Sequence, residues 1–293
     1  MEASRRVEQP GPEAPERLES AVGRLVRLDF TLEPGLTLNA AVAGPLLRAG
    51  LAGAQVEISG GALSPFTYVM PAAAPDATHA AWYSAPFAPA GAARVVRGNV
   101  TFGHKGGAPF IHCHADWITA DGRRGVGHVM PHETVVAAPI HASAYGTADV
   151  ALTADFDPET NFTLFTPHAL AAPRGEGARL ALARVRPNVD LAAALAALCR
   201  RHGFAGGILR GGVGSLAGAR FDPLAPGGVL PQVTDYATEV FVGAGSVAAA
   251  GGTLAAALDI TLVGMSGIIA EGPLARGGNP VLITFELAVE ESG

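Results

Sequence analysis

The sequence predicts an α+β protein made of two homologous domains. Three observations lead to this prediction: an internal repeat, a helix-then-strand pattern in both copies, and a composition rich in turn-forming residues. The chain has 293 residues, of which 49% are hydrophobic and 16% charged, with 38 Gly and 22 Pro. Such a composition is typical of a well-packed globular protein with many short elements and turns.

The repeat consists of two blocks in each half. Residues 38–63 align without gaps with residues 191–216 at an offset of 153, and residues 114–129 align with residues 259–274 at an offset of 145. The first block of each pair predicts a helix followed by a strand and a glycine-rich turn. The second predicts a strand, a tight turn and a returning strand. Each copy therefore reads as one α+β unit.

The helix of the second copy has clear end signals. Asp190 is a predicted N-cap, and Gly203 is placed to end the helix. In the first copy Pro45 is expected to kink or shorten the corresponding helix, because proline lacks the amide hydrogen that a helix interior requires.

These patterns divide the chain into three parts. Residues 1–20 are polar and charged, without the apolar region of a signal peptide, and are expected to form a disordered tail. Residues 21–172 are predicted to form the first domain and residues 178–293 the second.

Composition also bears on location and partners. No stretch reaches the roughly 18 uninterrupted apolar residues of a membrane span, and two cysteines, Cys113 and Cys199, fit a reducing cytoplasm rather than a disulfide framework. The formal net charge is −6. Because nucleic-acid binders draw much of their affinity from phosphate neutralisation, this charge counts against DNA as a partner.

A pair of histidines within an apolar segment is the clearest chemical signal. In PFIHCHADW (109–117), His112 and His114 project to the same face of a predicted strand. A turn at Asp121–Gly122 returns a second strand that can bring His128 beside them. Three neutral imidazoles with an open position are typical of a catalytic divalent metal site, most of all zinc.

The alternative is that the histidines are only strand residues at a polar edge. The second copy favours metal binding, because it has Ala257, Asp259 and Pro273 at the three aligned positions while the glycines that shape the turn remain. Structural residues would tend to persist with the scaffold, whereas a site used once need not.

The segment from Pro109 to Val136 resembles the core of the PCC/PPC domain (plants and prokaryotes conserved), also known as domain of unknown function 296. The matching positions are Pro109, His112, His114, Gly122, Gly127 and His128. Val126 and Val129 depart from the pattern, where a glycine and a leucine are usual, and neither is a ligand position. The resemblance covers the first domain and, without the histidines, the second.

This resemblance implies domains with a mostly antiparallel sheet and a packed helix. It also implies a homo-oligomer, with a trimer favoured, and a histidine site near subunit boundaries. In plants the domain accompanies basic AT-hook segments, and the chain contains no such R-G-R-P-like tract. A DNA-binding role is therefore not carried over from the resemblance.

Four further residues are candidates for the chemistry of a site. Glu133 could act as a general base or support a ligand, and Asp116 could orient an imidazole or ligate. Arg210 and Arg276 lie beside paired glycines and could hold a substrate carboxylate. The alternatives are a solvated loop for Glu133 and exposed turn arginines for the other two.

Together these residues suggest a metal-dependent enzyme acting on a small, carboxylated metabolite by hydrolysis, hydration or isomerisation. The alternative is a DNA-associated or regulatory binding protein with a structural metal site. A third possibility is a scaffold that retains the histidines as relics.

Overall fold

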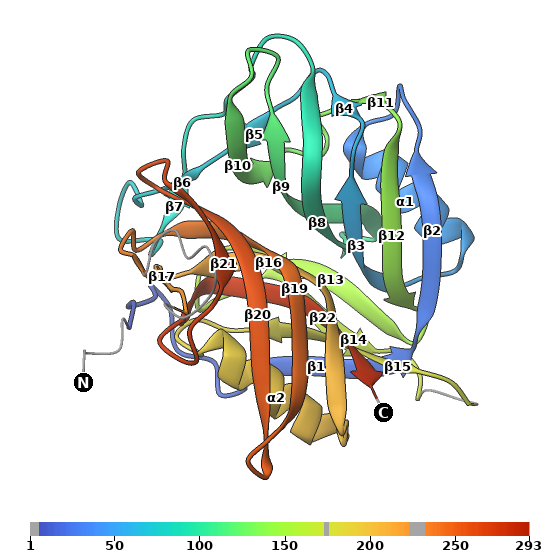
Figure 1. The fold of residues 1–293 in the computed structure, drawn as a ribbon, viewed down its shortest axis with the longest axis vertical. Coiled ribbons are helices and arrows are strands. Elements are labelled where there is room, and N and C mark those ends of the chain that lie inside the picture. The colour runs from blue at the N-terminus through green and yellow to red at the C-terminus, as the bar shows by residue number, and fades with distance from the viewer. Residues whose placement is uncertain (1–5, 173–175, 223–231, 293) are drawn as a thin grey trace.

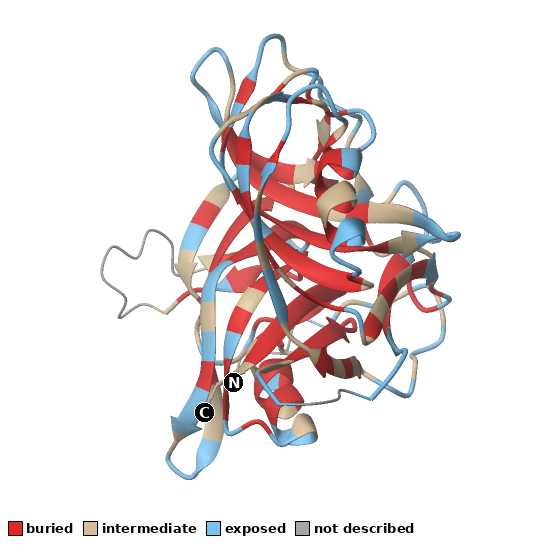
Figure 2. Cartoon of the chain, turned by 90° about the vertical axis from the view of Figure 1, so that its right-hand side faces the viewer, coloured by how far each residue is buried: buried red, intermediate tan, exposed pale blue. Residues whose placement is uncertain are grey.

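The computed structural model describes residues 6–172, 176–222 and 232–292. Two sheets lie face to face, and one helix packs on the outer side of each (Figure 1). Each helix forms a hydrophobic core with the sheet that it covers. Buried residues, red in Figure 2, run along the strands in the middle of the molecule, while the loops are exposed.

The first sheet has eleven strands and contains the predicted histidine segment. Its main path runs β2 (Val26–Leu32), β12 (Ile140–Thr147), β3 (Gly53–Ser59), β8 (Ala93–Lys105), β9 (Ala108–Ile118), β10 (Arg124–Val129), β5 (Tyr68–Val69). Beside this path lie β4 (Ala62–Leu63), β11 (Val136–Ala138), β13 (Val150–Phe156) and β14 (Thr163–Ala169). The helix α1 (Leu38–Arg48) covers this sheet, and β6 (Pro71–Ala72) pairs with β7 (Trp82–Tyr83) in a small separate ribbon.

The second sheet has seven strands. Their order is β1 (Leu18–Arg24), β15 (Arg179–Val185), β22 (Val281–Ser292), β16 (Gly206–Leu216), β19 (Thr238–Ala250), β20 (Thr253–Gly264), β21 (Ile269–Pro273). The helix α2 (Leu191–His202) covers it, and β17 (Ala219–Arg220) pairs with β18 (Gln232–Val233) outside it.

Strand order and register recur between the sheets. The order β2-β12-β3-β8-β9-β10 in the first corresponds to β15-β22-β16-β19-β20-β21 in the second. His114 pairs with His128 in the first sheet, and Asp259 pairs with Pro273 in the second, at the 145-residue offset of the sequence alignment. The structure is thus mostly antiparallel sheet, with two helices among the residues described. Homology of the two halves remains a prediction.

The helix ends follow the sequence signals. Asp190 caps α2 by accepting from the Ala193 amide at 3.0 Å, and Gly203 ends it with φ 66°. In α1, Thr37 is the N-cap, and the helix continues for three residues beyond Pro45. Proline therefore does not end this helix, although it removes one donor from the helix interior.

The start of the chain differs from the prediction. Residues 18–24, placed partly in a disordered tail and partly in the first domain, form β1 and pair antiparallel with β15 of the second sheet. Leu18 is buried in the core beneath α2. The edge of β15 offers unpaired backbone groups, and β1 satisfies them.

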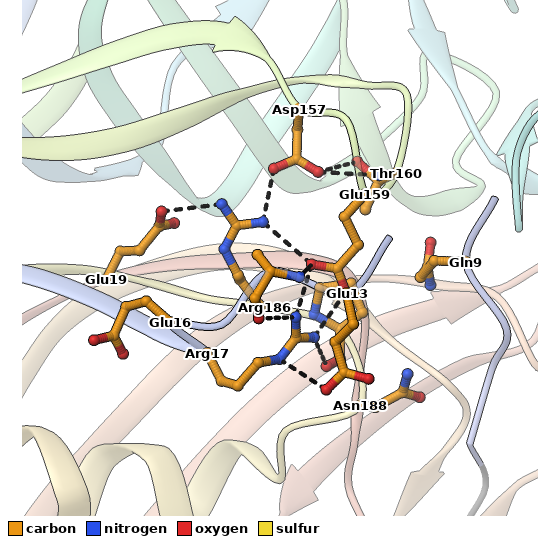
Figure 3. Close-up of polar contacts among 12 residues, drawn as sticks. Gln9, Glu13, Glu16, Arg17, Glu19, Asp157, Glu159, Thr160, Arg186 and Asn188 are labelled. Carbon is orange, nitrogen blue, oxygen red and sulfur yellow. Dashed lines mark hydrogen bonds and ion pairs between the residues drawn. The ribbon is translucent and has the colours of Figure 1, made fainter. Parts of the chain in front are cut away.

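Ion pairs hold the segment before β1 in place (Figure 3). Arg17 donates two hydrogen bonds to Glu159, at 2.7 and 2.8 Å, and Glu159 is itself buried. Arg186, from the loop after β15, contacts Glu159 at 3.2 Å and Glu19 at 3.0 Å. Arg17 also donates to the Pro187 carbonyl oxygen at 2.6 Å, so residues 6–17 are bound to both halves of the chain.

Two observations concern membranes and thiols. Across 6–172, 176–222 and 232–292, no helix has the length and apolarity needed to cross a membrane. Cys113 and Cys199 are both buried, free cysteines.

Candidate metal centre

Three histidines of the first sheet come together on the face that meets the second sheet. His112 and His114 alternate with Cys113 along β9, so they share one face, and His128 lies directly opposite His114 on β10. One ring nitrogen from each histidine lies within 4.8 Å of the other two. The structure thus gathers the three residues that the spacing predicted.

Groups of the second sheet orient two of these rings. His112 Nδ1 donates to Glu286 Oε2 at 2.8 Å, and His114 Nδ1 donates to the Val240 carbonyl oxygen at 2.9 Å. Carboxylate and carbonyl oxygens only accept, so the proton of each neutral ring sits on Nδ1. Each Nε2 is then left with a free lone pair.

These two lone pairs face each other across a short distance. His112 Nε2 and His114 Nε2 lie 2.9 Å apart, and Glu239 Oε2 also lies 2.9 Å from His114 Nε2. Neutral imidazoles of this tautomer and a carboxylate supply no hydrogen between these three atoms, so their close approach is repulsive without a cation. The donor set of imidazole nitrogens and a carboxylate oxygen fits a divalent transition metal.

His128 completes the cluster as a neutral ring. Its Nδ1 is buried and has no hydrogen-bond partner among the described residues. Burial, followed by the neighbouring His112 and His114, holds the pKa of His128 well below its usual value. A buried, unpartnered and neutral imidazole nitrogen is suited to accept a metal.

The pKa of His112 shifts the other way. Burial alone lowers it, but the charges of Glu286 and Glu239 and the hydrogen bond to Glu286 outweigh burial and raise the pKa. Tyr83 packs against His128, with ring centroids 5.3 Å apart, and burial together with the same two carboxylates raises the pKa of Tyr83. The two carboxylates of the second sheet thus act on His112 and Tyr83, whereas burial and the other two histidines act on His128.

The cluster is enclosed. His114 is fully buried, and the His112 side chain is only 14% exposed. Two adjoining cavities reach the cluster. Tyr83, His112 and Glu239 line one, with apolar side chains around them, and His128 and Glu286 line the other with Tyr83 and His112. The walls come from both sheets and from β7.

The predicted acids lie apart from this chemistry. Asp116 is on the same face of β9 as His114, but its carboxylate accepts from Arg124 at 2.8, 3.1 and 3.2 Å. Glu133 is exposed in the turn after β10, and no hydrogen bond or ion pair joins it to the histidines within the described chain.

The predicted arginines are also separate from the histidines. Arg210 donates to Glu290 at 2.7 Å and lies 4.7 Å over the Tyr145 ring. Arg276 is exposed in the turn between β21 and β22. Neither lines the two cavities beside the histidines.

Sequence reasoning missed Glu239 and Glu286. A signal for Glu286 was present, because it interrupts the apolar strand VLITFELAVE, and buried glutamates are rarely without a partner. Glu239 interrupts TEVFV in the same way. Which residues they face could not be read, because their partners lie on the other sheet.

No family model and no curated protein matches the chain. Among solved structures, it is similar to a plant- and prokaryote-conserved (PPC) protein from Pyrococcus horikoshii, with 14% identity and a TM-score of 0.38, over 50% of this chain and 93% of that one. A metal-containing protein from Archaeoglobus fulgidus matches with 18% identity and a TM-score of 0.38, over 51% and 98%. A third match, from Bacteroides thetaiotaomicron, has 9% identity and a TM-score of 0.36, over 47% and 90%.

These matches each cover about half of this chain, and the Pyrococcus protein is described as a PPC protein. The Bacteroides protein and one from Ralstonia eutropha are each described as a "putative DNA-binding protein". These descriptions contradict the expectation that counted against DNA, and nothing in the described residues or the matches supports the expected small-molecule ligand or trimer. The physical reason is that net charge averages over the surface and leaves local basic patches undetected.

Proposed function

We propose that this chain, similar to PPC proteins over half its length, is a binding protein in which three histidines hold one structural divalent ion. The observation that carries the proposal is the convergence of His112 Nε2 and His114 Nε2 at 2.9 Å, with both rings held from the second sheet. Two neutral rings at this distance oppose their lone pairs, and a shared metal ion relieves that repulsion.

Zinc is the ion that suits this set best. It binds neutral imidazole nitrogens, and its histidine ligands usually donate the N–H of their other ring nitrogen to a carboxylate or backbone carbonyl. His112 and His114 have these two kinds of partner in Glu286 and Val240. When bound, the ion supplies the positive charge that the converging nitrogens share.

A structural ion accounts for the surroundings better than a catalytic one. The cluster lies between two sheets, with His114 fully buried. Asp116 is committed to Arg124, and Glu133 is exposed elsewhere, so neither is positioned as a general base beside the ion. In this proposal the halves are homologous domains: the first supplies the histidines and the second encloses them. A cytoplasmic location remains our prediction.

Metal content tests the site directly. The full chain is purified without chelator, and bound metal is measured for the wild type and for His112→Ala, His114→Ala and His128→Ala. We expect about one ion per chain in the wild type and a small fraction of that in the variants. His168→Ala, at an exposed histidine of β14, is the matched control and should keep the metal. A wild type without metal contradicts the proposal.

Duplex DNA is the partner class to test, alongside other regulatory partners. Retention on immobilised duplex is measured across a range of salt concentrations. Binding through phosphates should weaken steeply as salt rises, because counterion release drives it. No retention at low salt would reject the DNA role and leave the metal site to be judged by metal content.

A further inference from the structure

One carboxylate of the second sheet faces the histidines without a cationic partner. Glu239, the second residue of β19, is buried, and its Oε2 lies 2.9 Å from His114 Nε2. In the described part of the chain no arginine or lysine forms an ion pair with Glu239. A buried carboxylate in this position needs a positive charge nearby.

His114 in its neutral form cannot meet this need. Its Nδ1 hydrogen is committed to the carbonyl of Val240, so its Nε2 presents a lone pair to Glu239. His112 Nε2 presents another lone pair to the same His114 Nε2, at 2.9 Å. Glu239 therefore faces acceptors, whereas a metal ion would turn all three atoms into ligands.

Glu286 differs from Glu239 in this respect. It receives the Nδ1 hydrogen of His112 at 2.8 Å and so has a donor. Its role is to position the ring of His112. The two glutamates thus differ in the ring nitrogen that they contact. Glu286 contacts the protonated Nδ1 of His112, whereas Glu239 contacts the unprotonated Nε2 of His114.

We propose that Glu239 is the fourth ligand of the ion, supplied by the second sheet to the three histidines of the first. This inference rests on the proposed function. Three imidazoles and one carboxylate complete the four-coordinate set of zinc, and four protein ligands are the mark of a closed, structural site. The first sheet thus supplies three ligands, and the second sheet supplies the fourth.

In such a site the ion would be bound by residues of both sheets and would connect them. Near it, the sheets also meet through Val126, Val213, Phe241 and Val263 and through the hydrogen bond from the Gly212 amide to Asn99. An ion bound by residues of both sheets binds the assembled molecule and not the separated sheets. Metal binding therefore stabilises this interface by mass action.

The test compares Glu239→Gln with Glu291→Gln, a matched control on β22 whose carboxylate pairs with Arg179. Cobalt(II) is the probe, because its visible absorption reports coordination, and zinc affinity is measured by competition with a chelator. We expect Glu239→Gln to weaken zinc binding by about tenfold or more and to change the cobalt spectrum, with the control unchanged. Identical affinity and spectrum in Glu239→Gln would overturn the assignment.

A second measurement uses the wild type alone, so it does not depend on whether a variant folds. Azide added to the cobalt-loaded protein should leave its spectrum unchanged, because four protein ligands leave no open position. A shift with azide would mean an open fourth position and would overturn the role of Glu239 while the three-histidine site stands. A wild type that binds neither cobalt nor zinc would instead refute the proposed function itself.

Discussion

Glu286 of the second sheet accepts a hydrogen bond from His112 Nδ1 of the first sheet at 2.8 Å. The two residues are separated by 174 positions in the sequence. This contact sets the tautomer of His112 and aims its Nε2 at His114. The geometry of the histidine cluster therefore depends on a residue outside the segment that carries the histidines.

Replacement of Glu286 should weaken metal binding without removing a ligand. In Glu286→Ala the ring of His112 loses its acceptor and can rotate, so we expect zinc affinity to fall about 10–100-fold. The number of ions bound at saturating zinc should stay the same. Isothermal titration with zinc measures both quantities. Unchanged affinity in Glu286→Ala would show that Glu286 does not orient His112.

Removal of the metal should lower thermal stability only where the site is intact. A ligand that binds the folded state stabilises it by about 2.7 kcal/mol at one hundred times its dissociation constant. A strong chelator should therefore lower the Tm of the wild type and leave the Tm of His128→Ala unchanged. His128 is the residue to replace because its Nδ1 has no partner to lose among the described residues. Equal shifts in both proteins would count against a role of His128 in metal binding.

Asp157 should make the stability of the protein depend on acid pH. Burial by itself raises its pKa, but the guanidiniums of Arg184, at 2.7 Å, and Arg186, at 2.8 Å, outweigh burial and lower it. Because the pKa is lower in the folded state, the ionised carboxylate stabilises the fold above its unfolded pKa of about 3.9. That contribution is lost as the pH falls through the folded-state pKa. Urea unfolding below pH 5 should show a shallower pH dependence in Asp157→Asn than in the wild type.

The same substitution should be destabilising at neutral pH. Asp157→Asn leaves two buried guanidiniums with Glu19 and Glu159 as their remaining acidic partners. We expect a loss of about 3 kcal/mol in the free energy of unfolding, the lower end of the range for breaking a buried ion pair. Chemical denaturation at pH 7 measures it. A loss below about 1 kcal/mol would mean that the remaining glutamates compensate fully.

Arg17 should matter more than Arg6, although both pair with glutamates near the start of the chain. Arg17 forms two hydrogen bonds with the buried Glu159, whereas Arg6 and Glu13 are both largely exposed. We expect Arg17→Ala to cost about 1–3 kcal/mol, because it leaves a buried acceptor less well satisfied. Arg6→Ala is the matched control and should have little effect on the Tm, as exposed pairs contribute little. Equal effects of the two substitutions would contradict the anchoring role of residues 6–17.

The sequence by itself determined the features that depend on residues close together in the chain, namely the histidine strands and the ends of α2. The alternation of His112 and His114, and the turn that returns His128, follow from strand geometry, and the structure brings these three histidines together. The caps of α2 at Asp190 and Gly203 were equally readable, because a cap acts within one turn of its helix.

The tertiary structure alone decided which distant residues meet. β1 lies on the second sheet because the edge of β15 is free to pair, and no local pattern in residues 18–24 names that partner. Glu239 and Glu286 reach the histidines only because two sheets from different halves of the chain pack face to face. Residue spacing specifies geometry within an element, whereas contacts between elements depend on how the whole chain buries its apolar surface.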